Sequence, residues 1–133
     1  MTPLSSRSAP MRLAAMVTAI NVLVAAGFSI AGLVSPKSIL PSGYAPTEAS
    51  FIFAMYAAAR SIPLAFMALI AIYKQSQSAL LILGTLAGFI QLLDAGVGLL
   101  QDDPGKSIGP LVIAAFQFFA MYRLSSFARS SAE

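Results

Sequence analysis

The chain has 133 residues, of which 58% are hydrophobic and only 10% are charged. An ordinary soluble domain carries about 25% charged residues, so this composition does not suit water as the main solvent. The net charge is +3, but the basic residues are scattered and form no stripe of the kind that binds nucleic-acid phosphates. The chain has no cysteine and no histidine, which excludes disulfides, thiolate nucleophiles and the usual ligands of haem and zinc. No cofactor is expected.

The first predicted element is a helix over residues 11–34, an apolar run that follows Pro10, a residue suited to the first turn of a helix. A secretory signal peptide is the alternative, since Arg7 and Arg12 lie at the start of the run. Such a peptide has an apolar core of about 7–15 residues and a small-residue cleavage site. This run is longer and no clear cleavage site follows it, so we expect a membrane span.

Three further apolar runs each approach or exceed the about 20 helical residues that cross a bilayer. Between them lie short segments rich in proline, glycine or polar residues, which interrupt helices. The predicted elements in order are loop 35–49, span 50–73, turn 74–78, span 79–100, turn 101–107 and span 108–124. Short connections favour antiparallel neighbours. The sequence therefore predicts an all-α fold, a single membrane domain over residues 1–133 that forms a four-helix transmembrane bundle.

The distribution of lysine and arginine predicts the orientation, because cytoplasmic loops carry more of them. One side of the predicted bundle has Arg7, Arg12, Lys74, Arg123 and Arg129, and the other side has Lys37 and Lys106. This difference predicts a multi-pass protein of the inner (plasma) membrane with both termini in the cytoplasm.

Polar side chains within the predicted spans are the main candidates for function. They are Asn21, Tyr56, Arg60, Gln91, Asp94 and Gln117. An ionisable group deep in the bilayer costs at least about 2.5–3.5 kcal/mol, so it normally faces the bundle interior, finds a partner or lines water. Arg60 and Asp94 carry opposite charges and are expected to form an ion pair.

Depth in the bilayer suggests which of these side chains meet. At a rise of about 1.5 Å per residue from the outer end of each span, Arg60 lies at about 15 Å, Gln91 and Gln117 at about 14 Å, and Asp94 and Tyr56 at about 9 Å. Tyr56 and Arg60 are four residues apart, and Gln91 and Asp94 three, so each pair shares a helix face. We expect these five residues to form one site for a small polar or anionic ligand. Asn21, at about 20 Å, is expected in a separate contact.

Small residues predict close packing between the helices. Gly84 and Gly88 form a GxxxG pattern in the third span, and Ala57, Ala58 and Ala59 give the second span a small surface. Packing within one bundle is the simpler interpretation of this pattern, and we prefer it to dimerisation.

The stretch FAMYAAARSIPLAFMALI, followed by LGTLAGFIQLLDAGVGLL, resembles small bacterial four-helix membrane families, and more broadly the DoxX-like proteins. The resemblance extends from the first span to Leu124 and is carried by an arginine in the second span and an aspartate in the third. It implies the four-helix architecture and Arg60 and Asp94 as a polar site. It supplies no substrate.

Three functions of different classes remain open. The polar site could hold a small solute or ion for binding or transport, which predicts a water-accessible cavity. Alternatively, the chain is an accessory or structural subunit of a membrane complex, or a homo-oligomer, and the polar residues hold the bundle together. The third hypothesis is an enzyme that acts on a lipid-like substrate with Asp94 as general acid or base. A neighbouring Arg60 would weaken Asp94 as an acid, so no catalytic residue is assigned.

Overall fold

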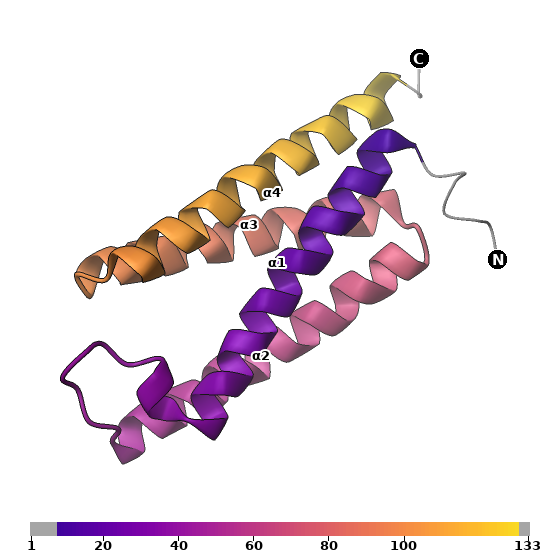
Figure 1. Cartoon of the computed structure of the whole chain (residues 1–133). Helices are drawn as coiled ribbons and strands as arrows, with labels where there is room; N and C mark the ends of the chain where they lie inside the picture. Colours follow the sequence, from indigo (N-terminus) through magenta and orange to yellow (C-terminus); the bar gives the residue numbers. More distant parts are fainter. Residues whose placement is uncertain (1–7, 131–133) are drawn as a thin grey trace.

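The structure is a computed structural model that describes residues 8–130, so Arg7 of the orientation count lies outside the described residues. The described chain forms α-helices and one short 3-10 helix, without a strand. The elements are α1 (Ala9–Val34), η2 (Pro36–Ser38), α2 (Glu48–Tyr73), α3 (Gln77–Leu100) and α4 (Pro104–Ser130) (Figure 1). Each of the four α-helices is long and apolar enough to cross a membrane. The predicted all-α four-helix architecture is confirmed.

Helix α4 differs most from its predicted span, because it begins at Pro104 and continues to Ser130. At its start the carboxylate of Asp103 accepts a hydrogen bond from the backbone N–H of Lys106 at 3.2 Å. This is the geometry of a helix N-cap, and proline suits the first helical position because its missing N–H would be unpaired there. At the other end the Ser125 hydroxyl donates to the helix backbone, to Tyr122 O at 2.9 Å. Polar residues that hydropathy assigned to a turn and a tail are therefore helical.

Helices α2 and α3 end in the same way, with a residue in the left-handed region. Gln75 has φ of 53° and Asp102 has φ of 52°. The next backbone N–H, of Ser76 and Asp103 respectively, donates to the carbonyl oxygen five residues earlier at 3.0 and 3.1 Å. These bonds form Schellman motifs, which pair the otherwise free carbonyls of the last turn. They make the reversals to α3 and α4 tight.

Helix α1 crosses the bundle diagonally, from the end of α4 to the start of α2 (Figure 1). Its first half packs in a cluster with the start of α3 and the end of α4, and its second half packs in a cluster with α2 and α3. The buried face of α2 consists entirely of alanine: Ala54, Ala58, Ala65, Ala68 and Ala71. Such small side chains allow helix backbones to approach closely.

Helices α3 and α4 pack most closely, through the predicted glycine pattern. A Cβ atom added at Gly84 would lie 2.8 Å from Gln117 Nε2, and one added at Gly88 would lie 3.0 Å from the Phe118 ring. The pattern therefore serves packing within the bundle, as predicted.

Helices α2 and α3 meet at the turn that contains Lys74 and diverge away from it (Figure 1). Within the described residues α2 contacts α1 and α3 but makes no contact with α4. Beyond the region near the turn, α2 residues such as Ala57 and Arg60 are exposed.

Candidate functional site

Four of the buried polar side chains, from three helices, bond to one another and form what we call the amide network: Thr18, Asn21, Gln91 and Gln117. Gln91 Nε2 donates to Asn21 Oδ1 at 2.8 Å, and Asn21 Nδ2 donates to Gln117 Oε1 at 3.0 Å. Gln117 Nε2 in turn donates to Thr18 Oγ1 at 2.8 Å. The exposed fraction of these residues is between 0% and 4%. The network therefore joins α1 to α3 and α4 in a closed interior.

The amide network lies near the middle of the bundle. Asn21 is about 18 Å along α1 from Ala9, and Gln117 is about 20 Å along α4 from Pro104, at a rise of about 1.5 Å per residue. A buried amide without a partner is costly, and hydrocarbon supplies none. The amides therefore satisfy one another, which gives the helices a defined rotation and register.

The network corrects one part of the sequence prediction. Gln91 and Gln117 meet, as expected, but through Asn21, which was assigned to a separate contact. The error came from the start of the fourth span, because α4 begins at Pro104 rather than at residue 108. Gln117 and Asn21 are each about 20 Å from the helix end on the same side of the bundle, by the helical rise. Thr18 was missed, although its spacing of three residues from Asn21 places both on one face of α1.

The other three predicted site residues, Tyr56, Arg60 and Asp94, lie outside the amide network and are exposed. Among the described residues the one ion pair joins Lys106 to Asp103, so the predicted pair between Arg60 and Asp94 is wrong. The physical reason is the divergence of α2 from α3 beyond the Lys74 turn. Residues at compatible depths meet only where their helices lie close together at that depth.

Arg60 and Asp94 nevertheless lie on the sides of α2 and α3 that face each other nearer the turn. Arg60 precedes Leu64 by one helical turn and Ala68 by two, and Asp94 follows Ala87 by two turns. Leu64, Ala68 and Ala87 belong to one apolar cluster that joins α1, α2 and α3. Arg60 and Asp94 therefore lie on the same sides of α2 and α3 as these contact residues, farther from the turn, where the two helices separate. We call this exposed surface, defined by Arg60 and Asp94 and the residues one turn from each, the open α2–α3 face.

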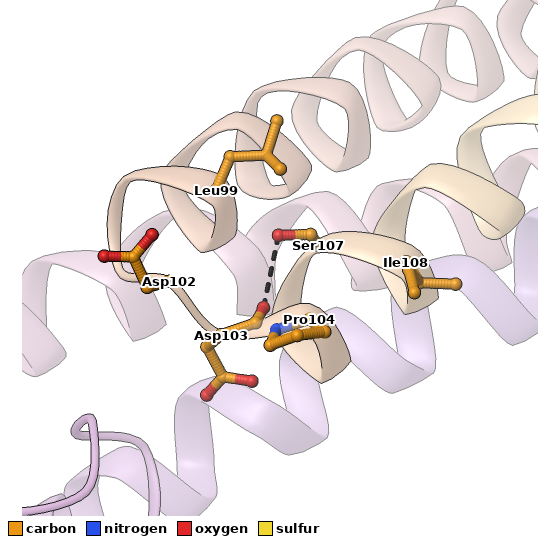
Figure 2. A pocket seen from close by; sticks show the side chains of 6 residues that line it. All are labelled: Leu99, Asp102, Asp103, Pro104, Ser107 and Ile108. Atoms are coloured by element: carbon orange, nitrogen blue, oxygen red, sulfur yellow. Dashed lines mark hydrogen bonds between the residues drawn. The ribbon is translucent and has the colours of Figure 1, made fainter.

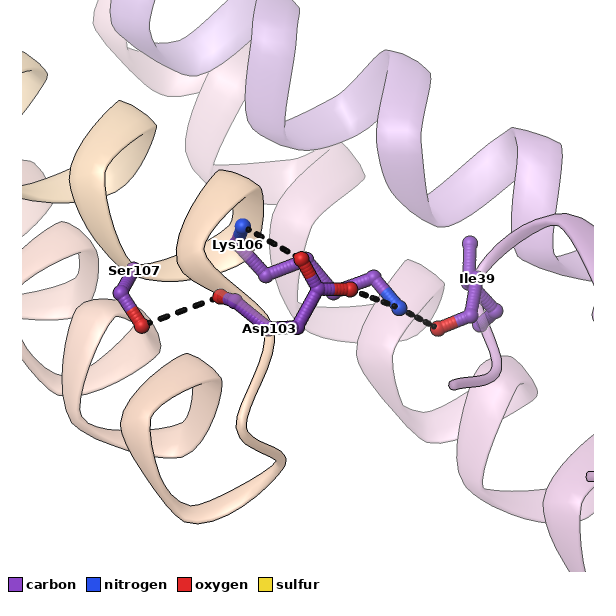
Figure 3. Close-up of polar contacts among 4 residues, drawn as sticks. All are labelled: Ile39, Asp103, Lys106 and Ser107. Carbon is purple, nitrogen blue, oxygen red and sulfur yellow. Dashed lines mark hydrogen bonds and ion pairs between the residues drawn. The ribbon is translucent and has the colours of Figure 1, made fainter. Parts of the chain in front are cut away.

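A polar clamp fastens the turn between α3 and α4 to the loop between α1 and α2 (Figure 3). Lys106 Nζ pairs with Asp103 Oδ2 at 3.3 Å and donates to Ile39 O at 2.8 Å. The hydrogen bond from the Lys106 backbone, helped by the charge of its side chain, lowers the pKa of Asp103. The clamp joins the two halves of the bundle at the end opposite Lys74.

The lowered pKa of Asp103 predicts a pH-dependent contribution to stability. A group with a depressed folded-state pKa stabilises the fold above its unfolded value of about 3.9, and this contribution disappears as pH falls through the folded-state pKa. We expect Asp103→Asn to lower the melting temperature in detergent at pH 7, and the difference from wild type to close in acid, as pH falls through the lowered folded-state pKa of Asp103. Asp102→Asn, which removes a neighbouring carboxylate outside the clamp, is the matched control. An equal difference at every pH would contradict the role of the Asp103 charge.

A pocket of about 310 Å³ opens beside the clamp, at the turn between α3 and α4 (Figure 2). It is lined by Leu99, Asp102, Asp103, Pro104, Ser107 and Ile108. Its polar groups are largely occupied within the chain, since the Ser107 hydroxyl donates to Asp103 O at 3.2 Å and the Asp103 carboxylate is held by Lys106. The described residues contain no group of three acidic, histidine or cysteine side chains that could hold a metal. The exposed Asp102 carboxylate remains, and a single acidic group does not identify a ligand.

No family model, curated protein or solved structure matches the chain. The resemblance to DoxX-like proteins therefore stays an expectation from the sequence. Two features of the described residues bear on function, the closed amide network and the charges on the open α2–α3 face.

Proposed function

We propose that this protein is a membrane subunit that binds another membrane protein through the open α2–α3 face, with Arg60 and Asp94 as charged anchors. The observation that carries this proposal is that both charges lie within membrane-spanning helices, are exposed, and have no partner among the described residues. The accessory-subunit hypothesis is thereby preferred to solute transport and to catalysis.

The position of Arg60 makes an external partner energetically favourable. It lies about 18 Å along α2 from Glu48 and about 20 Å from Tyr73, at a rise of about 1.5 Å per residue. An arginine at the centre of a span costs at least about 2.5–3.5 kcal/mol on insertion scales, and such residues normally face protein or a polar cavity. A protein that covers this face and presents a carboxylate would offset that cost.

The amide network supports a structural role more than a binding role. Each of its amides bonds to another side chain of the network, and none of the four residues is more than 4% exposed. A solute would have to break these bonds and reach a closed interior. The network therefore supports a rigid bundle that presents its outer face to a partner.

Small residues on the open α2–α3 face also favour a protein partner. Ala57 lies one turn before Arg60 on the same side of α2 and is exposed. Small exposed residues on membrane helices allow a neighbouring helix to approach closely. A guest helix could thus pack beside Arg60 and exclude lipid from the guanidinium.

Photocrosslinking in native membranes tests the proposal. A photoreactive amino acid at position 57 should form a protein adduct of defined mass, and this adduct should be lost when Arg60→Gln is added. The control is the same probe at Phe66, which is exposed on the opposite side of α2. We expect only lipid adducts there. Lipid adducts alone at both positions would refute the proposal.

The orientation, with both termini in the cytoplasm, is a second proposal supported by the charge distribution around the spans. Because the chain has no native cysteine, Ser42→Cys and Ser78→Cys each introduce a single thiol at an exposed position. An impermeant maleimide should label Ser42→Cys in intact cells, and Ser78→Cys only after permeabilisation. The reverse labelling pattern would show that both termini lie outside the cytoplasm.

A further inference from the structure

We infer that the partner of the open α2–α3 face is a second copy of this chain, docked so that Arg60 of each copy pairs with Asp94 of the other. This inference rests on the proposed function and names its partner. The face carries one charge of each sign on two neighbouring helices, so it is complementary to a copy of itself. A two-fold axis along the membrane normal places α2 of one copy against α3 of the other and forms two equivalent ion pairs.

The depths of the two residues are compatible with such a pairing. Arg60 lies about 18 Å from the start of α2, and Asp94 lies about 9 Å from the end of α3, at a rise of about 1.5 Å per residue. These two helix ends are on the same side of the bundle, and rotation about the membrane normal does not change depth.

Side-chain direction reduces this difference in depth. The Cα–Cβ bond of a helical residue tilts toward the N-terminus of its helix. In α2 this tilt carries Arg60 toward the side where α2 begins, and in α3 it carries Asp94 toward the Lys74 turn. The two side chains therefore lean toward each other in depth, and the long arginine side chain bridges the remainder.

A single copy does not make this ion pair among the described residues, and α2 and α3 diverge away from the turn that contains Lys74 (Figure 1). A second copy supplies both missing partners at once. Exposed apolar or small residues lie one turn from each charge, Ala57 on α2 and Val97 on α3. In the dimer they surround the ion pairs and exclude water from them, which strengthens the attraction between the charges.

Charge reversal with reciprocal rescue tests the inference. Arg60→Asp places two acidic groups on the face, and Asp94→Arg places two basic groups there. Each variant alone should lose association by about tenfold or more, since like charges then meet across the dimer. When the two variants are mixed, every new acidic group faces a basic one. We therefore expect a mixed dimer with an affinity near that of wild type.

The experiment uses full-length chains that carry two different tags, co-expressed and reconstituted in lipid vesicles. Association is measured by co-purification in mild detergent and by energy transfer between labelled copies in the vesicles. Rescue in the mixture also shows that both variants are folded. If a reversal variant fails to insert, Arg60→Gln and Asp94→Asn replace the reversals, and each should weaken association.

Failure of the inference is distinguishable from failure of the proposed function. A monomeric wild type, together with a position-57 adduct whose mass is not that of a dimer, would overturn the inference and leave a different protein as the partner. Recovery in the double variant Arg60→Asp/Asp94→Arg without rescue in the mixture would overturn it as well, since the pair would then form within one chain. Absence of any protein adduct would refute both.

Discussion

Gly98→Ala should destabilise the protein by about 3 kcal/mol, because the new methyl group overlaps the backbone of α4 and overpacking of this kind is costly. A Cβ atom at this position would lie 2.6 Å from Ser107 N and would overlap the backbone carbonyl of Lys106. A backbone cannot rotate away as a flexible side chain can. The tight reversal between α3 and α4 also restricts any shift of the two helices. The expected result is a marked fall in the melting temperature in detergent.

Gly96→Ala is the matched control for this prediction. It lies two residues earlier on the same helix, and a Cβ atom there has no neighbour within 4 Å. Alanine is a better helix former than glycine by about 1 kcal/mol, so this variant should melt at the wild-type temperature or slightly above it. Equal melting temperatures for the two variants would show that α3 and α4 are farther apart at Gly98 than described.

Gln117→Met should be the most damaging change in the amide network, with an expected loss of about 2–3 kcal/mol. Gln117 accepts a hydrogen bond from Asn21 and donates one to Thr18, so its replacement leaves a buried amide N–H without its acceptor. Methionine keeps a similar volume, so the effect reports hydrogen bonding rather than packing. Phe116→Met, at the exposed neighbouring position, should change the melting temperature little.

Replacement of all three amides tests whether they form one shared network or three independent contacts. The triple variant Asn21→Leu/Gln91→Met/Gln117→Met removes donors and acceptors together, and Thr18 can bond a carbonyl of its own helix. We expect it to be more stable than the sum of the three single losses predicts, because no unpaired amide remains. Strictly additive losses would contradict the network. They would instead fit amides that are each bonded to water, which would favour the solute-binding hypothesis.

The amide network and the open α2–α3 face are connected through α1. The network fixes α1 against α3 and α4, while α1 also holds α2, where Ser29 Oγ donates to Ser61 Oγ at 2.9 Å. Helix α1 therefore sets how far α2 stands from α3. In the proposed docking, these interior hydrogen bonds hold the helices that keep Arg60 and Asp94 apart on the open α2–α3 face.

The four helices follow from the sequence with little error, because a backbone in hydrocarbon must bond to itself and a long apolar run can do so only as a helix. Helix ends were less predictable, since hydropathy does not register an N-cap such as Asp103 or a reversal such as the one at Gln75. The GxxxG pattern also led correctly to close packing, because only small residues permit that approach.

The partners of the polar residues were decided by the arrangement of the helices in space. The hydrophobic periodicity of the sequence predicts the depth of a residue and the face of its own helix on which it lies. It does not determine the angle at which that helix crosses another. That angle arises from packing between residues distant in the chain, such as the alanines of α2 against α1. The diagonal course of α1 brings Asn21 to Gln91 and Gln117. The divergence of α2 from α3 separates Arg60 from Asp94, although their charges and depths had favoured a pair.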